Sequence, residues 1–387
     1  MKKIITTVLI PFILAGCKIS QNKSVEYPFS SVARLGALAF SDPSLSATGK
    51  QSCASCHAPE YGHAAPNDLS VQLGGNDGTI AGLRNSQPLR YLATNTDFKL
   101  DERGRPSGGF FWDGRANSLV QQAAGPLLGA REMANPDKAA VVEKISRATW
   151  VEKFKEEFGP YILENVDLAF EKLTKAIAQF QMEDLQFNGF TSKYDAVLRG
   201  QSILSAQEKN GLMLFNNPNK GNCAACHTST KSEDGRHPLF TDFSYDNLGV
   251  PRNADIPENT LTNYYDLGLC GRIELRDRTD LCGYFKVPSL RNVVLRKSFF
   301  HNGKFKSLRD VLTFYVERDI YPEKWYSKDS DGMVQKFDDL PLKWHENVNR
   351  SEAPYKNQLG NSPALNPSEI DDLLKFLETL TDGWQLK

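Results

Sequence analysis

The sequence carries no excess of charge of either sign, because 46 lysine and arginine residues stand against 47 aspartate and glutamate residues in a chain of 387. Proteins that bind nucleic acid through its phosphates usually carry a basic excess, so this balance argues against a nucleic-acid partner. Runs that alternate apolar and polar residues are scarce, which argues against a core built on a sheet. The length and a hydrophobic content of 40% favour two folded domains.

Long apolar runs are also missing, apart from one at the N-terminus that has the layout of an export signal. Two lysines precede the run 4–14, which is too short for a permanent membrane helix. Small residues before Cys17 match a bacterial lipobox, which predicts removal of residues 1–16 and a lipid on Cys17; a plain signal peptide with a chance cysteine is the alternative. Residues 17–28 then form a polar tether. We therefore expect a periplasmic protein whose contact with a membrane is its lipid anchor, in a compartment that favours disulfides.

The two halves of the chain repeat one another in order. The pentapeptide CASCH at 53–57 pairs with CAACH at 223–227, and a similar apolar segment precedes each. Residues 110–119 (FFWDGRANSL) align without a gap on residues 299–308 (FFHNGKFKSL). An internal repeat of this kind predicts two related domains.

Local signals favour short helices joined by long loops. Apolar residues recur at helical spacing from Val166 to Leu185. Asn366 is a good N-cap, Pro367 suits the first helical position, and an apolar stripe follows over 370–380. We expect a mainly α fold with an internal duplication, and place its domains at residues 29–188 and 189–387.

Each CxxCH motif is typical of covalent haem attachment. Two cysteines three positions apart can add to the two vinyl groups of a haem, and the adjacent histidine can ligate its iron. A thioredoxin-type redox pair and a zinc site shared by both CxxC units are alternatives. A redox pair does not need the histidine, and zinc does not explain why the whole pentapeptide recurs inside two repeated blocks. We therefore predict two c-type haems, held by Cys53, Cys56 and His57 and by Cys223, Cys226 and His227.

Two cysteines remain in the second half, Cys270 and Cys282. They lie in an insertion that has no counterpart in the first half. In an oxidising compartment, a disulfide that closes this loop is the expected state.

Taken together, the motifs resemble the bacterial di-haem cytochrome c peroxidases and their MauG relatives. The segments CASCH, RNSQP, FFWDGR, QAAGP, REM, the second CxxCH, VPSLRN and FFHNG follow in the family's order, over about residues 29–383. The resemblance implies two cytochrome-c-like helical domains, with the peroxide site at the first haem and a second haem that stores or relays electrons. It assigns Trp112 to the position between the haems, and Gln122 and Glu132 to the distal glutamine and the catalytic glutamate. Without the resemblance, Trp112 would be interpreted as a core aromatic residue and Glu132 as a surface acid.

The resemblance also implies a calcium ion between the haems. Its protein ligands would be the side chain of Asn85 and the main-chain carbonyls of Arg296 and Ser298. Asn85 taken alone is equally compatible with a role in shaping a turn.

Two positions depart from the cytochrome c peroxidase branch of the family. That branch has a removable distal histidine on the first haem, but here the only histidine between the two CxxCH motifs is His63, which follows the first motif too closely. We therefore expect a vacant sixth position on that haem. The branch also has a methionine where this chain has Tyr315, whereas MauG proteins have tyrosine there. In the internal repeat Tyr315 matches Pro126, which cannot ligate iron. The alternative ligands of the second iron are Met333, His237 and water.

The expected activity is reduction of hydrogen peroxide with electrons from a small cytochrome c or a cupredoxin. Glu132 would move a proton between the two peroxide oxygens, Gln122 would orient the bound oxygen, and Trp112 would link the haems. A MauG-like oxidase that modifies a residue on a periplasmic partner protein is the second hypothesis. A non-catalytic electron-transfer or sensor protein is the third, and Gln122 and Glu132 argue against it.

Overall fold

The computed structural model describes residues 29–385, so the predicted signal, the tether and the lipidation site at Cys17 lie outside the described residues. The fold over this range is rich in helix and poor in sheet, as the sequence predicts. Within residues 29–385, no helix combines the length and apolarity needed to cross a bilayer.

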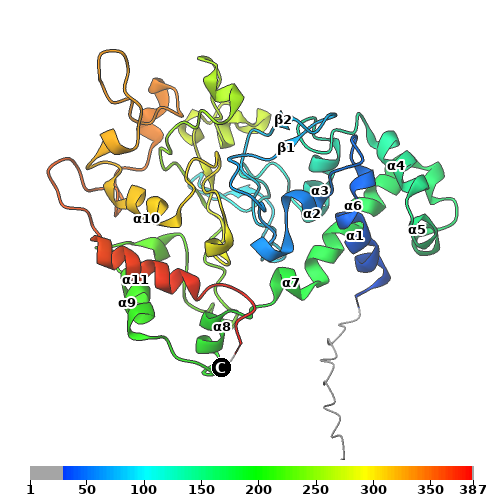
Figure 1. Ribbon diagram of the computed structural model, residues 1–387, viewed down its shortest axis with the longest axis horizontal. Coiled ribbons are helices and arrows are strands. Elements are labelled where there is room, and N and C mark those ends of the chain that lie inside the picture. Colours follow the sequence, from blue (N-terminus) through cyan, green and yellow to red (C-terminus); the bar gives the residue numbers. More distant parts are fainter. Residues whose placement is uncertain (1–28, 386–387) are drawn as a thin grey trace, which may run out of the picture.

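The helices form one group in each half of the chain (Figure 1). The first half contains α1 (Ser31–Ser41), α2 (Cys53–Cys56), α3 (Leu119–Leu128), α4 (Lys138–Arg147), α5 (Val151–Phe158), α6 (Val166–Glu183) and α7 (Leu185–Asn188). The second half contains α8 (Lys193–Leu198), α9 (Ala206–Asn216), α10 (Leu308–Glu317) and α11 (Pro367–Glu378). Figure 1 shows α1 and α3–α6 on one side and α9–α11 on the other, with looped segments between them.

Three short antiparallel strand pairs are the only paired strands among the described residues. They join β1 (Leu73–Gly74) to β2 (Ile80–Ala81), β3 (Lys99–Leu100) to β4 (Pro106–Ser107), and β5 (Tyr245–Asp246) to β6 (Phe285–Lys286). Each strand has two residues, so the pairs shape loops and do not form a layer of the fold.

Each half has its own apolar core. In the first half, α6 packs against α1, α3 and α4, and in the second half α11 packs against α9 and α10. A glycine stands at the tightest crossing of each half: a Cβ on Gly36 would lie 1.9 Å from the carbonyl oxygen of Ala176, and one on Gly211 would lie 2.1 Å from that of Asp372. Only glycine permits this approach, and the two glycines occupy matching positions of the sequence repeat.

The repeated FFxxG segments also bend alike. Phe111 and Phe300 have φ of 66° and 65°, a left-handed conformation that is uncommon for phenylalanine. Each segment then leads into a ten-residue helix, α3 or α10, whose N-cap is Ser118 or Ser307. Pro126 and Tyr315 consequently occupy the same position of two equivalent helices.

Helix boundaries agree with the sequence at one end of the chain and differ in the middle. Asn366 caps α11 by accepting from the backbone N–H of Glu369, and Pro367 is its first residue, as predicted. The helix expected over 166–185 ends at Glu183 instead. The Asp184 carboxylate accepts from the N–H of Gln186 and starts α7, which leaves Leu185 48% exposed rather than on the apolar stripe.

The second-half insertion contains the disulfide between Cys270 and Cys282. Its leucines form a small apolar cluster with Tyr245, and Arg272 donates to the carbonyl oxygens of Asp113 and Gly114 in the first half. The insertion therefore packs against the loop that carries Trp112.

Candidate active site

The structure contains two large cavities, one around each CxxCH motif. Cys53, Cys56 and His57 line the first cavity, which encloses about 2340 Å³ of empty space including its opening to solvent. The second motif, residues 223–227, lines the second cavity, which encloses about 1660 Å³ on the same measure. Both walls are predominantly apolar, as expected of a site for a large planar cofactor.

The two motif histidines are held in a single tautomer. His57 Nδ1 lies 3.2 Å from the carbonyl oxygen of His63, and His227 Nδ1 lies 2.8 Å from that of Phe240. A carbonyl oxygen only accepts hydrogen bonds, so each Nδ1 carries the hydrogen and each Nε2 keeps its lone pair for a metal. Burial also lowers the pKa of His57 to about 4 and lowers that of His227, which keeps both rings neutral.

The four motif cysteines do not suit the alternatives to haem. They are free thiols, and burial raises the pKa of Cys53, Cys223 and Cys226 to about 12, whereas redox-active cysteines have a lowered pKa. The two pairs line different cavities, so they cannot share a zinc ion. Over the described range, no three histidine, cysteine or acidic side chains are grouped to hold a metal ion.

Trp112 forms part of the wall of both cavities. Its side chain is buried, and its indole N–H donates to the carbonyl oxygen of Asn85 at 2.8 Å. Its own carbonyl oxygen accepts from the backbone N–H of Lys286 at 2.9 Å. Trp112 is therefore fixed at the boundary by residues from both halves.

Lys286 and an ion-pair network surround this boundary. The buried Lys286 ammonium donates to the carbonyl oxygens of Gly108, at 2.8 Å, and Gly109, and it also lines both cavities. Arg84 bridges Asp113 of the first half and Asp266 of the second, at 2.7 and 2.6 Å. Arg84 holds the pKa of the partly buried Asp266 at about 2. These contacts join the two halves beside Trp112.

Three side chains from α3 and the turn after it face the first cavity. Gln122 and Pro126 lie one turn apart on α3, and Glu132 follows in the next turn. Backbone contacts hold this turn, because Gly75 donates to the Glu132 carbonyl oxygen at 2.9 Å. A Cβ on Gly74 would lie 2.3 Å from the carbonyl oxygen of Arg131, so the approach requires glycine.

The Glu132 carboxyl is accessible from the cavity yet closely surrounded by protein. Burial raises its pKa, and the positive charge of Arg115 opposes this rise. Arg115 lies over the Phe111 ring at 3.6 Å and pairs with Asp113. A carboxyl with a raised pKa holds its proton more readily than an ordinary glutamate does, which favours its use in proton transfer.

His63 is not among the residues that line the first cavity. Its ring is buried and stacks on Phe187 with centroids 3.9 Å apart, and its Nδ1 accepts from Arg90. Its contribution to the site is the carbonyl oxygen that orients His57. Among the described residues, His57 is the only histidine in the wall of this cavity.

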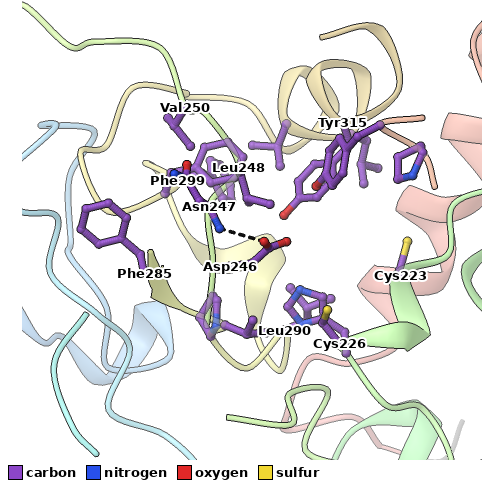
Figure 2. Close-up of a pocket in the computed structure, with 18 of the residues that line it drawn as sticks. Cys223, Cys226, Asp246, Asn247, Leu248, Val250, Phe285, Leu290, Phe299 and Tyr315 are labelled. Carbon is purple, nitrogen blue, oxygen red and sulfur yellow. Dashed lines mark hydrogen bonds between the residues drawn. The ribbon is translucent and has the colours of Figure 1, made fainter. Parts of the chain in front are cut away.

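Tyr315 faces the second cavity from α10. Figure 2 shows its side chain on the far side of the cavity from Cys226, with Asp246 between them. Burial raises the Tyr315 pKa, and the nearby Asp246 and motif cysteines raise it further. A neutral phenol is thus favoured without a cation, and a bound cation would have to supply the charge that stabilises a phenolate.

The other proposed ligands of the second iron lie elsewhere. Met333 is 66% exposed and is absent from the cavity wall. The His237 imidazole pairs with the buried Asp195 at 2.6 Å, which also binds Arg291. Of the three side chains considered as ligands, only Tyr315 lines the second cavity.

The residues expected to bind calcium lie near the boundary between the cavities. Asn85 is buried and its backbone N–H donates to the carbonyl oxygen of His301 at 2.7 Å. Arg296 lines the second cavity. The buried Ser298 hydroxyl has no hydrogen-bond partner within residues 29–385.

Sequence reasoning missed Lys286, Arg84 and Asp266, which surround Trp112 at the boundary between the cavities. Lys286 and Arg84 were readable only as ordinary charged residues, because their partners lie in the other half of the chain. The Leu83-Arg84-Asn85 and Leu290-Arg291-Asn292 repeat was a signal that could have drawn attention to Arg84.

Comparisons with known proteins agree with this geometry. Residues 30–203 match the family model described as di-haem cytochrome c peroxidase. The chain is 36% identical to the methylamine utilization protein MauG of Paracoccus denitrificans, over 91% of this chain and 89% of that protein. It is 31% identical to the cytochrome c peroxidase Ccp of Escherichia coli, over 75% of this chain and 54% of that protein.

A solved structure is similar over most of the chain. The diheme peroxidase BthA from Burkholderia thailandensis superposes with a TM-score of 0.85 at 38% identity, covering 92% of this chain and 87% of that chain.

Proposed function

Because the chain belongs to the di-haem cytochrome c peroxidase and MauG family, we propose that it is a periplasmic peroxidase that reduces hydrogen peroxide with electrons from an external donor. The observation that carries this proposal is the difference between two cavities that share Trp112. One presents Gln122 and Glu132 and has Pro126 where the other has Tyr315. One site would therefore accept peroxide while the other exchanges electrons.

The residues present fit two covalently bound haems. Each cavity offers two free thiols for thioether bonds and a histidine whose Nε2 is left for iron. When bound, each haem supplies the redox-active iron that the protein itself lacks. The chain would contribute Cys53, Cys56 and His57 to the first haem and Cys223, Cys226 and His227 to the second.

The first cavity supplies proton transfer and orientation. The Glu132 carboxylate would accept a proton from one peroxide oxygen and deliver it to the other, so that water leaves as the O–O bond breaks. Two electrons from the external donor and two protons would convert the remaining oxygen into a second water. The Gln122 amide would donate a hydrogen bond to the peroxide and so orient it. The fixed backbone around Glu132 keeps its carboxylate within the cavity, which favours repeated transfer from one position.

His227 and Tyr315, which both line the second cavity, would supply the protein ligands of the second iron. An anionic phenolate stabilises oxidised iron over reduced iron, which suits storage of an oxidising equivalent. Trp112 supports this role, because it is buried and contacts both cavities.

A second candidate function is oxidation of a residue on a periplasmic partner protein, as in a MauG-like enzyme. Tyr315 and the 36% identity to a MauG protein favour it. Assays with a reduced small cytochrome c or cupredoxin distinguish the two: consumption of peroxide at the expense of these donors supports the peroxidase. Consumption only with the partner protein would favour the second candidate. A non-catalytic electron carrier or sensor would consume no peroxide at all.

Calcium, the domains and the location complete the proposal. Calcium would be held by the Asn85 side chain and the carbonyl oxygens of Arg296 and Ser298, and the unpartnered Ser298 hydroxyl supports a polar ligand there.

We place the first-haem domain at 29–188 and the second at 189–387, related by duplication, because their helix crossings and FFxxG bends correspond. Export, removal of residues 1–16 and a lipid on Cys17 would tether the protein to a membrane.

The test is peroxide turnover by the haem-loaded protein and its Glu132→Gln variant. Loss of a general acid or base lowers turnover by about a hundredfold or more, so Glu132→Gln should keep both haems and lose most activity. Glu143→Gln is the matched control, because Glu143 pairs with Arg147 on the surface. Equal turnover by the two variants would remove Glu132 from the mechanism.

A further inference from the structure

Arg296 is a buried arginine in the wall of the second cavity. Its Nη2 is enclosed by protein and has no hydrogen-bond partner within residues 29–385. The other two buried arginines of this half bind carboxylates, because Arg291 pairs with Asp195 and Arg318 with Asp319. A buried charge without a counter-charge is costly, so the Arg296 guanidinium requires an anion.

The acidic side chains of the same wall already have other partners. They are Asp246, Asp266, Asp339 and Glu352. Asp266 pairs with Arg84 at 2.6 Å, and Asp339 pairs with Arg252 at 3.5 Å. The side-chain amide of Asn349 donates to the other two carboxyls, at 3.0 and 3.1 Å. The anion for the arginine is therefore expected to come from the group that occupies the cavity.

The position of Arg296 indicates which anion this is. Its guanidinium carbon lies 5.8 Å from the centre of the Phe299 ring. Figure 2 shows Phe299 on the side of the cavity away from Cys223 and Cys226. A haem that is joined to these cysteines through its vinyl groups carries its two propionate carboxylates on the opposite edge of the ring.

We infer that the Arg296 guanidinium binds a propionate carboxylate of the second haem. A guanidinium can donate two parallel hydrogen bonds to one carboxylate, which fixes the orientation of both groups. The pair would neutralise the buried cation and hold the haem edge that the thioether bonds leave free. This inference rests on the proposed attachment of the second haem to residues 223–227.

The variants Arg296→Leu and Arg296→Lys test the inference in the haem-loaded protein. The first removes the charge and the donors, the second keeps the charge without the planar fork, and neither removes the main-chain carbonyl. A propionate bending band in the resonance Raman spectrum should shift in Arg296→Leu. An uncompensated propionate stabilises oxidised iron, so at the wild-type midpoint the ratio of oxidised to reduced second haem should rise roughly tenfold. Arg296→Lys should restore part of that change.

Arg309→Leu is the matched control, because it removes the same group from a surface position in the same half. Arg309 pairs with Asp371, and its side chain is 43% exposed. This variant should leave the propionate bands and the potential of the second haem unchanged. If Arg296→Leu gives the same spectrum and potential as Arg309→Leu, the inference is wrong.

Two further measurements identify the anion and separate this inference from the proposed function. At constant ionic strength, the potential of the wild-type second haem should not depend on the chloride concentration. A dependence that Arg296→Leu abolishes would assign Arg296 to a free anion and overturn the inference. If denaturing mass spectrometry finds no haem on residues 223–227, the proposed function fails and the inference with it. If both haems are present and the propionate bands of Arg296→Leu are unshifted, only the role of Arg296 fails.

Discussion

Replacing Arg115 with glutamine should move the pH dependence of peroxide turnover. In the proposed mechanism Glu132 must be deprotonated to accept a proton, so activity should be lost as the pH falls through its pKa. Burial already raises that pKa above the usual value, and Arg115 is the charge that opposes the rise. Removing Arg115 leaves burial uncompensated, so the Glu132 pKa should increase and the acidic limb of the profile should move to higher pH.

The size of the shift in the Glu132 pKa follows from the solvent exposure of Arg115. The Arg115 side chain is 46% exposed, so solvent weakens its effect on Glu132. Charge pairs with this exposure contribute about 0–1 kcal/mol, which corresponds to a pKa change of less than about one unit. Turnover on the alkaline side of the limb should change little, because Arg115 does not itself transfer the proton.

The assay is the profile of kcat/KM for peroxide between about pH 4 and 8, which reports the pKa values of the free enzyme. Arg105→Gln serves as the control, because Arg105 pairs with Asp101 in the same half and is absent from the cavity wall. A limb that stays in place in Arg115→Gln, or moves to lower pH, would refute the electrostatic reasoning. A limb that moves equally in both variants would show a general effect of charge.

Three further outcomes are expected. Mass spectrometry under denaturing conditions should find two covalently attached haems on the mature chain, and one or none would contradict the assignment of both CxxCH motifs. The double variant Cys270→Ala/Cys282→Ala should lower the free energy of unfolding in urea by about 3 kcal/mol, because the bond closes a loop with a sequence separation of 12; an unchanged midpoint would disprove this. Tyr315→Met should raise the potential of the second haem in a redox titration, since a thioether favours reduced iron; a lower or equal potential would count against Tyr315 as the ligand.

The sequence predicts those parts of the structure that depend on neighbours along the chain. Asn366 and Pro367 start α11 where expected, because capping is completed within one helical turn. The predicted end of the long helix that starts at Val166 was wrong by two residues, because α6 ends at Glu183 and not at Leu185. The apolar spacing continued to Leu185, but the local hydrogen bond of Asp184 ends α6 and starts α7. The periodic spacing of apolar residues does not reveal which polar side chain accepts a hydrogen bond from a backbone N–H.

The candidate site also contains some residues that the sequence predicts and some contacts that only the structure shows. The CxxCH spacing predicts the haem-binding residues, because thiols and histidine must come from one short segment to reach one haem. The family resemblance selected Trp112, Gln122 and Glu132, whose neighbours along the chain carry no signal of their chemistry. That Trp112 belongs to both cavities, and that Lys286 donates to the loop before it, became visible only in the structure.

The sequence alone therefore determined the helical class and the two CxxCH motifs. It also determined the repeat position at which the second half has Tyr315 and the first half has Pro126. Tertiary structure decided what surrounds these residues: Arg115 beside Glu132, the pairing of Arg84 with Asp266, and the contact of Tyr355 with Tyr315. The physical reason is that pKa values and ligand strength depend on charges and hydrogen bonds within a few ångströms. Those neighbours come from segments far apart in the chain, so only folding brings them together.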